Sequence, residues 1–385
     1  MEGLWQRVRE VEPEVIGWRR DIHAHPEVGF EEVRTAGLVA SVLEGLGLRV
    51  RKGVGGTGVV AELEAGAKTR VGLRADMDAL RITEENDVPY RSQHEGVGHM
   101  CGHDAHVAML LGVAKVLAGM RKELKHNVRF IFQPCEETPG GAAKMVEAGV
   151  MEGVDEIYAI HVDSTQPSGV LSVREGPALA SADRVKITIE GKGGHAAMPH
   201  TTHDPVVAAA EVIQAVQTIA SRRTDPVDLV VVSICQVHGG TTFNVIPSRV
   251  ELEGTVRTLN AETRERTIAL LDEIVRLAAA VHGCKGTVEV PGKYPLVVND
   301  AGAVKRVFKT AAVLFDSPEA VRHDQPRMGG EDFSYYLEKV PGALVWLGIR
   351  NPEKGIVHEH HHPRFDIDES ALVNGVALLA GLTLS

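Results

Sequence analysis

In the first part of the chain, short runs of hydrophobic residues alternate with longer, mainly apolar segments. Runs of about four to eight apolar and β-branched residues are typical of buried strands, and longer apolar segments are typical of helices. The expected strands cover residues 59–63, 71–75, 128–133 and 157–160, and the expected helices cover residues 104–120 and about 140–149. Segment 4–46 predicts two helices broken at His25-Pro26, because proline ends a helix. This alternation predicts an α/β fold with a mostly parallel sheet and helices on both faces.

A different pattern begins near residue 183, where residues 184–190 alternate polar and apolar side chains as a half-exposed strand does. Further expected elements are helices at about 205–221 and 261–282 and strands at 229–237, 249–259 and 287–290. Their β-α-β-β-α-β order predicts a two-layer α+β unit. We therefore expect residues 183–291 to form a domain inserted into a first domain, which comprises residues 1–182 and 292–385. The first domain resumes with helices near 301–314 and 331–339 and a strand at 343–347.

The composition narrows the classes of protein to which the chain can belong. With 385 residues, 44% of them hydrophobic, the chain is long enough for two domains. A formal net charge of −11 argues against nucleic acid as the main partner, since phosphate backbones bind basic surfaces. No long apolar segment or basic amphipathic helix indicates a membrane, and the N-terminus lacks the apolar region of a signal peptide. The four cysteines are scattered and lack the spacing of a disulfide framework, so they are interpreted as free thiols in a reducing compartment. We therefore expect a cytoplasmic protein.

Side chains that can bind metal ions or transfer protons follow three of the expected strands. Asp76 and Asp78 come after the second strand, Glu136 and Glu137 after the third, and His161 at the end of the fourth. In parallel sheets with covering helices, ligands bind beyond the carboxyl ends of the strands. The sequence therefore predicts that these side chains meet at one edge of the sheet.

The segment HMCGHDAH (99–106) concentrates candidate metal ligands within eight residues. Thiolate and imidazole groups bind first-row divalent ions, and Gly102 permits a backbone turn that lets Cys101 and His103 face one point. We expect Asp104 to be the N-cap of the helix that follows. Two interpretations remain open from these residues alone: a metal site, or a polar turn before a core helix.

Two further clusters have both a functional and an ordinary interpretation. Adjacent glutamates such as Glu136-Glu137 usually form a solvated acidic turn, but beside metal ions one can bind metal while the other accepts a proton. A lone histidine such as His161 is more often a core residue, and HEHHH (358–362) is compatible with a solvated loop. Taken together, the clusters supply one thiolate, three imidazoles and two carboxylates, enough for two ions that share a ligand.

The chain resembles the amidohydrolase branch of the two-metal aminoacylase and carboxypeptidase superfamily. This branch includes hippurate hydrolases, N-acyl-amino-acid amidohydrolases, auxin-conjugate hydrolases and related thermostable carboxypeptidases. The resemblance spans nearly the whole chain in the family's order. The matching stretches are RRDIHAHPEVGFEE (19–32), RADMDAL (74–80), GHMCGHDAHVAMLLG (98–112), FQPCEETPGGAAKM (132–145), AIHV (159–162), GKGGHAAMPH (191–200), GGTTFNVIP (239–247), GGEDFSYY (329–336) and HHPRFDIDE (361–369).

The resemblance implies a metal-binding catalytic domain in which Glu136 is the general base and Asp76 and Asp78 orient the ligands. His361 is preferred to His362, because the family's ligand lies two residues before the proline, here Pro363. The identity of the metal stays open among zinc, manganese, cobalt and nickel. The implied ligands of two divalent ions are Cys101, His103, Glu137, His161 and His361.

The resemblance also implies that the inserted domain is a lid and a dimerisation surface, so we expect a homodimer or homotetramer. It assigns stabilisation of the oxyanion to His195, either within its own subunit or across the dimer. It assigns contacts with the substrate's carboxylate end to Asn244 and Arg257, and the planar fork of an arginine suits a carboxylate.

The implied activity is hydrolysis of the amide bond of N-acyl amino acids, such as N-acetyl or N-benzoyl compounds, by a water that two metals activate. An alternative is a metallo-carboxypeptidase that acts on short peptides or blocked dipeptides. Two other classes are a thiol hydrolase that uses Cys101 or Cys135 and a non-catalytic metal-binding protein. The chain departs from the family's common pattern at Arg81 and Cys135, which leaves substrate preference open.

Overall fold

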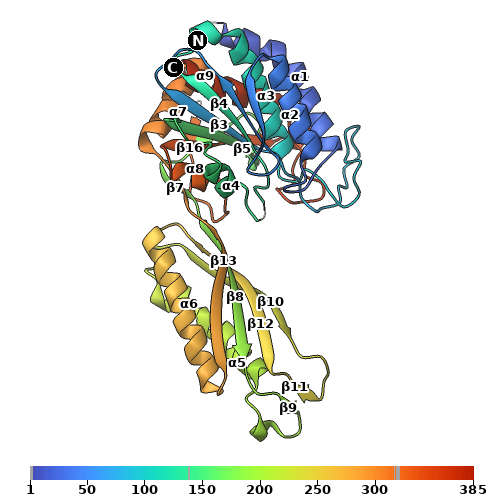
Figure 1. Cartoon of the computed structure of the whole chain (residues 1–385), viewed down its shortest axis with the longest axis vertical. Helices are drawn as coiled ribbons and strands as arrows, with labels where there is room; N and C mark the ends of the chain where they lie inside the picture. The colour runs from blue at the N-terminus through green and yellow to red at the C-terminus, as the bar shows by residue number, and fades with distance from the viewer. Residues whose placement is uncertain (1–2, 138, 316, 318–320) are drawn as a thin grey trace. The chain divides into compact units, whose positions relative to one another are not determined.

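The computed structural model describes every residue except 1–2, 138, 316 and 318–320, and its contacts divide the chain into two compact units (Figure 1). The first unit comprises Met1–Gly176, Val298–Gln325 and Asp332–Ser385, and the second comprises Pro177–Val297 and Pro326–Glu331. The segment 183–291, expected as an inserted domain, lies inside the second unit, which extends beyond it at both ends.

An eight-stranded sheet forms the centre of the first unit, in the order β1-β2-β4-β3-β5-β16-β6-β15. Its four central strands, β4, β3, β5 and β16, run parallel. Strand β2 pairs antiparallel with β1 and β4, and β6 pairs antiparallel with β16 but parallel with β15. The edge strands were not expected from the sequence, because they are short or carry many charged side chains. The strands are β1 (Arg49–Val54), β2 (Gly58–Leu63), β3 (Arg70–Asp76), β4 (Asn127–Gln133), β5 (Glu156–Pro167), β6 (Leu171–Val173), β15 (Val321–His323) and β16 (Gly342–Arg350).

Helices cover both faces of this sheet, as the sequence predicts. Five long helices share one hydrophobic cluster with every second residue of the central strands. The two short helices lie on the opposite face, where Met145 packs beside Gly58 and Leu337 beside Gly342. The long helices are α1 (Leu4–Ala24), α2 (Val33–Gly45), α3 (His103–Gly119), α7 (Ala301–Leu314) and α9 (Leu372–Leu384), and the short ones are α4 (Ala142–Glu147) and α8 (Ser334–Leu337).

The carboxyl ends of β3 and β4 lie side by side, because Asp76 is in register with Gln133. Strand β5 continues past the expected end, since its pairing with β16 extends beyond His161. His161 is therefore inside a strand rather than at its end, opposite Trp346.

The expectation that Asp104 caps helix α3 is wrong. The helix begins at His103, its N-cap is Gly102 with a φ of 88°, and no side chain caps it. Asp104 instead lies in the first turn, where its buried carboxylate accepts a hydrogen bond from His23 at 2.8 Å and pairs with Arg19 at 2.9 Å. These partners are about 80 residues away in the chain, so no local rule could have indicated them.

A four-stranded antiparallel sheet in the order β10-β12-β8-β13 forms the second unit with two helices that share its hydrophobic cluster. The order along the chain is β8-α5-β10-β12-α6-β13, the β-α-β-β-α-β order expected from the sequence. The strands are β8 (Ser181–Glu190), β10 (Val230–Gly239), β12 (Arg249–Thr258) and β13 (Lys285–Tyr294), and the helices are α5 (Pro205–Val216) and α6 (Ala261–Val281). Two small sheets pair β9 (Gly194–His195) with β11 (Val245–Ile246), and β7 (Gly176–Leu179) with β14 (Val297–Asn299).

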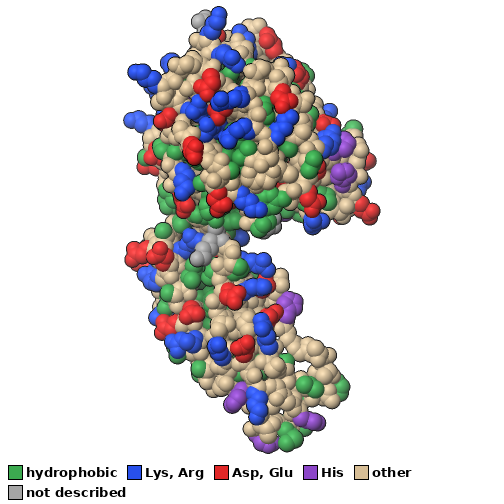
Figure 2. All heavy atoms as spheres, viewed as in Figure 1, with side chains coloured by type: hydrophobic (Ala, Val, Ile, Leu, Met, Phe, Trp, Pro, Cys, Tyr) green, Lys and Arg blue, Asp and Glu red, His purple; other side chains and the backbone are tan. Residues whose placement is uncertain are grey.

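Charged side chains of both signs are interspersed over the face of each unit that Figure 2 shows. Among the described residues, no helix is both long and apolar enough to span a membrane.

Candidate metal centre

His103, the first residue of α3, presents one ring nitrogen without a hydrogen-bond partner to the interior. Its Nδ1–H donates to the carbonyl of Asp78 at 2.9 Å and lies 3.2 Å from the Asp78 carboxylate. The ring is fully buried, and Nε2 has no hydrogen-bond partner among the described residues. A buried nitrogen without a partner is destabilising unless something binds it. Metal-binding histidines typically donate the N–H of their other ring nitrogen to a carboxylate or a backbone carbonyl, which fixes the ring.

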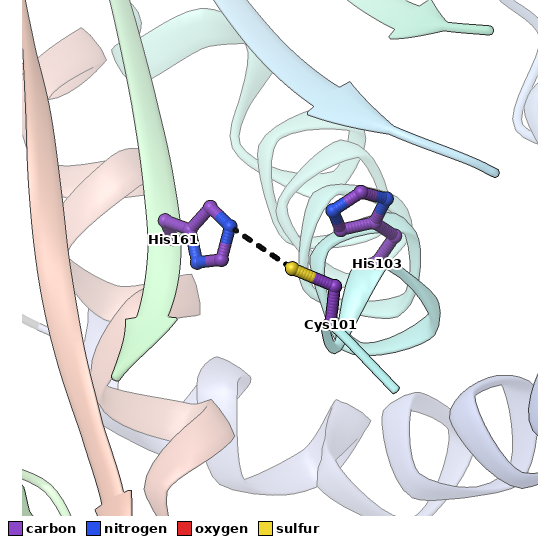
Figure 3. Close-up of side chains that lie close together, drawn as sticks. All are labelled: Cys101, His103 and His161. Atoms are coloured by element: carbon purple, nitrogen blue, oxygen red, sulfur yellow. Dashed lines mark hydrogen bonds between the residues drawn. The ribbon is translucent and has the colours of Figure 1, made fainter. Parts of the chain in front are cut away.

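His161 on β5 and Cys101 before α3 point toward the same space as His103 (Figure 3). The Nδ1–H of His161 donates to the Val162 carbonyl at 2.8 Å, so its Nε2 is the accepting nitrogen and forms a hydrogen bond with the Cys101 sulfur at 3.8 Å. The turn between Cys101 and His103 depends on Gly102, because a Cβ there would clash with Val162. The Cys101 thiol and the imidazoles of His103 and His161 therefore face one space, and His161 joins them from outside the segment 99–106.

His106 lies beside this group but uses both of its ring nitrogens. Its Nδ1–H donates to the Asp76 carboxylate at 2.6 Å, and its Nε2 accepts the backbone N–H of Val162 at 3.0 Å. The contact with Asp76 and the bond to the strand that carries His161 give His106 a structural role.

The glutamate pair follows β4 and is held by Asp78. One carboxylate oxygen of Asp78 accepts the backbone N–H of Glu136 at 2.9 Å, and the other accepts that of Glu137 at 3.1 Å. Because the same carboxylate also contacts His103, Asp78 links the histidine of α3 to both glutamates.

Glu136 has a further contact, with a residue that the sequence did not single out. The backbone N–H of Asp332 donates to a carboxylate oxygen of Glu136 at 3.3 Å. The Asp332 side chain in turn accepts hydrogen bonds from Gln133 and from the backbone of Gly141, and it pairs with Arg74. Asp332 belongs to the stretch GGEDFSYY, so the resemblance was the only signal for it.

Of the histidines at 358–362, His361 contacts the glutamate pair, with Nε2 at 3.2 Å from a carboxylate oxygen of Glu137. His361 adopts a φ of 65°, which is unusual for a residue with a side chain. His360 instead uses both nitrogens, on Ser164 and the Val162 carbonyl, and His362 accepts the backbone N–H of Arg364.

These side chains form overlapping groups whose potential ligand atoms lie within 4.8 Å of one another. One group is Cys101, His103 and His161, and another is Cys101, Glu137 and His361. Cys101 belongs to both groups, so its sulfur would be available to a cation held by either group. The donor set of sulfur, imidazole and carboxylate fits a borderline divalent ion such as zinc. The buried Nε2 of His103, which has no hydrogen-bond partner among the described residues, would bind such an ion.

Without a cation, the site retains protons that a metal would displace. Burial, and then the carboxylates of Glu137, Glu136 and Asp76, raise the pKa of the Cys101 thiol well above its usual value. Burial lowers the pKa of His103, but the carboxylates of Asp76 and Asp78 outweigh it and raise that pKa to about 10. At neutral pH the metal-free site therefore holds a thiol and a protonated imidazole.

Metal uptake is expected to release protons and to become stronger as the pH rises. The Cys101 thiol and the His103 imidazolium have raised pKa values, and each binds a cation only after losing its proton. Below those pKa values, each displaced proton makes the metal affinity about tenfold stronger per pH unit. Isothermal calorimetry of the metal-free protein in buffers of different ionisation enthalpy counts the released protons. Cys101→Ala should release one proton fewer, and an affinity independent of pH would contradict this description of the site.

The expected substrate-binding residues lie in the second unit. His195, in β9, accepts the backbone N–H of Ala197 on Nδ1 at 3.0 Å, which leaves Nε2–H as an exposed donor. Asn244 precedes β11, and its carbonyl accepts the N–H of Ala196, so it adjoins His195. Arg257, in β12, is half-buried and donates to the carbonyl of Met328 at 3.4 Å.

Comparison with known proteins places these observations in a family. Residues 72–385 match the model of peptidase family M20/M25/M40. The chain is 41% identical to thermostable carboxypeptidase 2 of Saccharolobus solfataricus over 99% of this chain and 98% of that protein. It is also 41% identical to the N-acetylcysteine deacetylase of Bacillus subtilis over 93% of both. The crystal structure of the Bacillus subtilis YXEP protein, a dinuclear metal binding peptidase from the M20 family, superposes with a TM-score of 0.85 at 37% identity, covering 98% of each chain.

The family assignment agrees with the resemblance found in the sequence and with the α/β fold of the first unit. Because the family model covers most of the chain and the relatives match it nearly from end to end, this chain belongs to peptidase family M20/M25/M40, a family of hydrolases.

Proposed function

We propose that this protein is a metal-dependent hydrolase that cleaves the amide bond of N-acyl amino acids and releases a free amino acid. The observation that carries the proposal is the pair of ligand groups that share Cys101 beside the buried carboxylate of Glu136. The proposed ligands of the two divalent ions are Cys101, His103, Glu137, His161 and His361. Relatives named as a deacetylase and a carboxypeptidase support hydrolysis of either an acyl group or a peptide end.

When bound, two divalent cations lower the pKa of a water and polarise the amide carbonyl. Glu136 accepts a proton from that water on its carboxylate and passes it to the leaving amine. The hydrogen bond from the Asp332 backbone keeps the Glu136 carboxylate in one orientation during both transfers. Asp78 fixes His103 and the backbone of both glutamates, so ligand and base keep their separation.

Residues of the second unit are proposed to bind the substrate. The exposed Nε2–H of His195 suits donation to a developing oxyanion, a contact typically worth about 3–4 kcal/mol. We assign Arg257 and Asn244 to the free carboxylate of the amino-acid part, because a guanidinium binds both carboxylate oxygens.

The second unit is also proposed to join two subunits into a homodimer or homotetramer. Strand β10 is an edge strand, and it carries an exposed Val237; Val206 and Val207 of α5 are exposed as well. The reduced cysteines fit the proposed cytoplasmic location, since Cys101, Cys135, Cys235 and Cys284 are all free.

A substrate panel combined with Arg257→Ala tests this function. N-acetyl, N-benzoyl and indole-acetyl amino acids are compared with short peptides and with the same acyl amino acids blocked as carboxamides. Arg257→Ala should raise KM about 10-fold to 100-fold for substrates with a free carboxylate, and it should have little further effect on the carboxamides. Equal losses on both substrate types would remove Arg257 from the carboxylate site. Faster turnover of peptides than of every acyl amino acid would favour the carboxypeptidase alternative.

A further inference from the structure

The stretch RRDIHAHPEVGFEE contributes no metal ligand to the proposed site, yet its last residue, Glu32, contacts the loop that carries the glutamate pair. Glu32 is fully buried in the first unit. One of its carboxylate oxygens accepts the backbone N–H of Cys135 at 2.8 Å, and the other accepts the hydroxyl of Thr57. Cys135 immediately precedes Glu136.

The peptide that Glu32 holds has an unusual backbone conformation. Cys135 adopts a φ of 52°, in the left-handed region that residues with a side chain rarely occupy. Such conformations persist where surrounding contacts enforce them. Gly29 packs so closely against Cys135 that a Cβ at Gly29 would lie 2.8 Å from the Cys135 Cβ. The turn 29–32 is therefore pressed against the loop from one side and hydrogen-bonded to it.

Three consecutive backbone N–H groups of this loop are thus held by two buried carboxylates. Glu32 accepts the N–H of Cys135, and Asp78 accepts those of Glu136 and Glu137. Asp78 also contacts His103, whereas Glu32 contacts the loop from the side of Thr57. The two acids fix the loop from different elements.

Capping of a helix does not account for the buried carboxylate of Glu32. Glu32 occupies the N-cap position of α2, but its side chain makes no capping hydrogen bond to that helix. Burial raises the pKa of its carboxyl, so the site disfavours a charge there. Burial of the Glu32 carboxylate is energetically unfavourable, and its hydrogen bond goes to the loop that carries the glutamate pair. This combination indicates that Glu32 serves to hold that loop.

We propose that Glu32 is a positioning residue for the hydrolysis reaction: its contact with the Cys135 backbone holds Glu136 and Glu137 at their working separation. This inference rests on the proposed function, in which Glu136 is the general base. Displacement of a reacting group by about 1 Å can reduce the rate on the order of a hundredfold. Loss of the Glu32 contact therefore affects kcat more than KM.

The test compares Glu32→Ala, Glu32→Gln and the control Val39→Ala, all in the full chain at saturating metal. Val39 is fully buried on the same helix but lies in the hydrophobic cluster and has no polar atom in its side chain. Glu32→Ala should lower kcat about 10-fold to 100-fold with little change in KM. Glu32→Gln should recover most of the loss, because its amide oxygen still accepts the Cys135 N–H. Val39→Ala should lower the melting temperature without lowering kcat.

Hydrogen–deuterium exchange of the metal-free variants gives a second readout. The amides of Cys135, Glu136 and Glu137 should exchange faster in Glu32→Ala than in Val39→Ala. If Glu32→Ala does not fold, Thr57→Val decides, since it removes the partner of the other carboxylate oxygen and should lower kcat in the same way.

The inference is overturned if the alanine variant of Glu32 (or Thr57→Val, where that variant does not fold) matches Val39→Ala in kcat, KM and exchange. It is equally overturned if Glu32→Gln is as impaired as Glu32→Ala. Failure of the proposed function has a different signature, because Glu136→Gln would then keep its activity whatever happens at Glu32.

Discussion

Glu136→Gln is expected to lower kcat about a thousandfold or more while the protein keeps its fold and its metal. Glutamine has the same shape, and its backbone N–H can still donate to Asp78, but its amide cannot accept a proton from water. General acid–base catalysis contributes about 10²–10⁴-fold, and here one residue serves in both proton transfers. Steady-state kinetics and metal analysis of the purified variant measure this effect.

Glu147→Gln is the matched control, because Glu147 is an exposed glutamate at the end of α4, the helix that follows the glutamate pair in the chain. It should retain the wild-type kcat. Full turnover by Glu136→Gln would exclude Glu136 as the base. If the wild type turned over neither acyl amino acids nor short peptides, the result would favour a non-catalytic metal-binding protein.

Removal of metal is expected to lower activity more than about a hundredfold, and added zinc, manganese, cobalt or nickel should restore it to different degrees. The reason is that no other group in the described site is able to activate water or polarise the carbonyl as a divalent cation does. Activity after chelation, dialysis and addition of each metal measures the effect.

The same assay separates this mechanism from a thiol hydrolase. Burial raises the pKa of Cys135 to about 12 and contributes to the raised pKa of Cys101, so neither is a reactive thiolate without metal. Iodoacetamide should modify the exposed Cys235 in the metal-loaded enzyme and leave activity unchanged, with Cys235→Ser as the control. A chelated enzyme that stays active and is inhibited by iodoacetamide would support the thiol mechanism instead.

The sequence predicted the central strands and indicated which polar residues follow the apolar runs. Buried parallel strands consist mainly of apolar runs, and polar residues where such runs stop are easily seen, as with Asp76 at the last position of β3 and Glu136 after β4. The β-α-β-β-α-β order of the second unit was equally clear, because β8 alternates buried and exposed residues along its length.

Contacts between distant segments could not be predicted from local patterns. Asp104 resembles an N-cap, but its carboxylate pairs with Arg19, which lies in α1. Glu32 and Asp332 meet the glutamate loop from positions about 100 and 200 residues away. Such contacts depend on packing of elements against one another, and only the resemblance to a family drew attention to their sequence stretches.

Anomalous diffraction from crystals grown with excess cobalt tests the central claim most directly. The claim predicts two anomalous peaks in the space lined by Cys101, His103, Glu137, His161 and His361, with the Cys101 sulfur in contact with both ions. A single peak, or peaks away from Cys101, would contradict it.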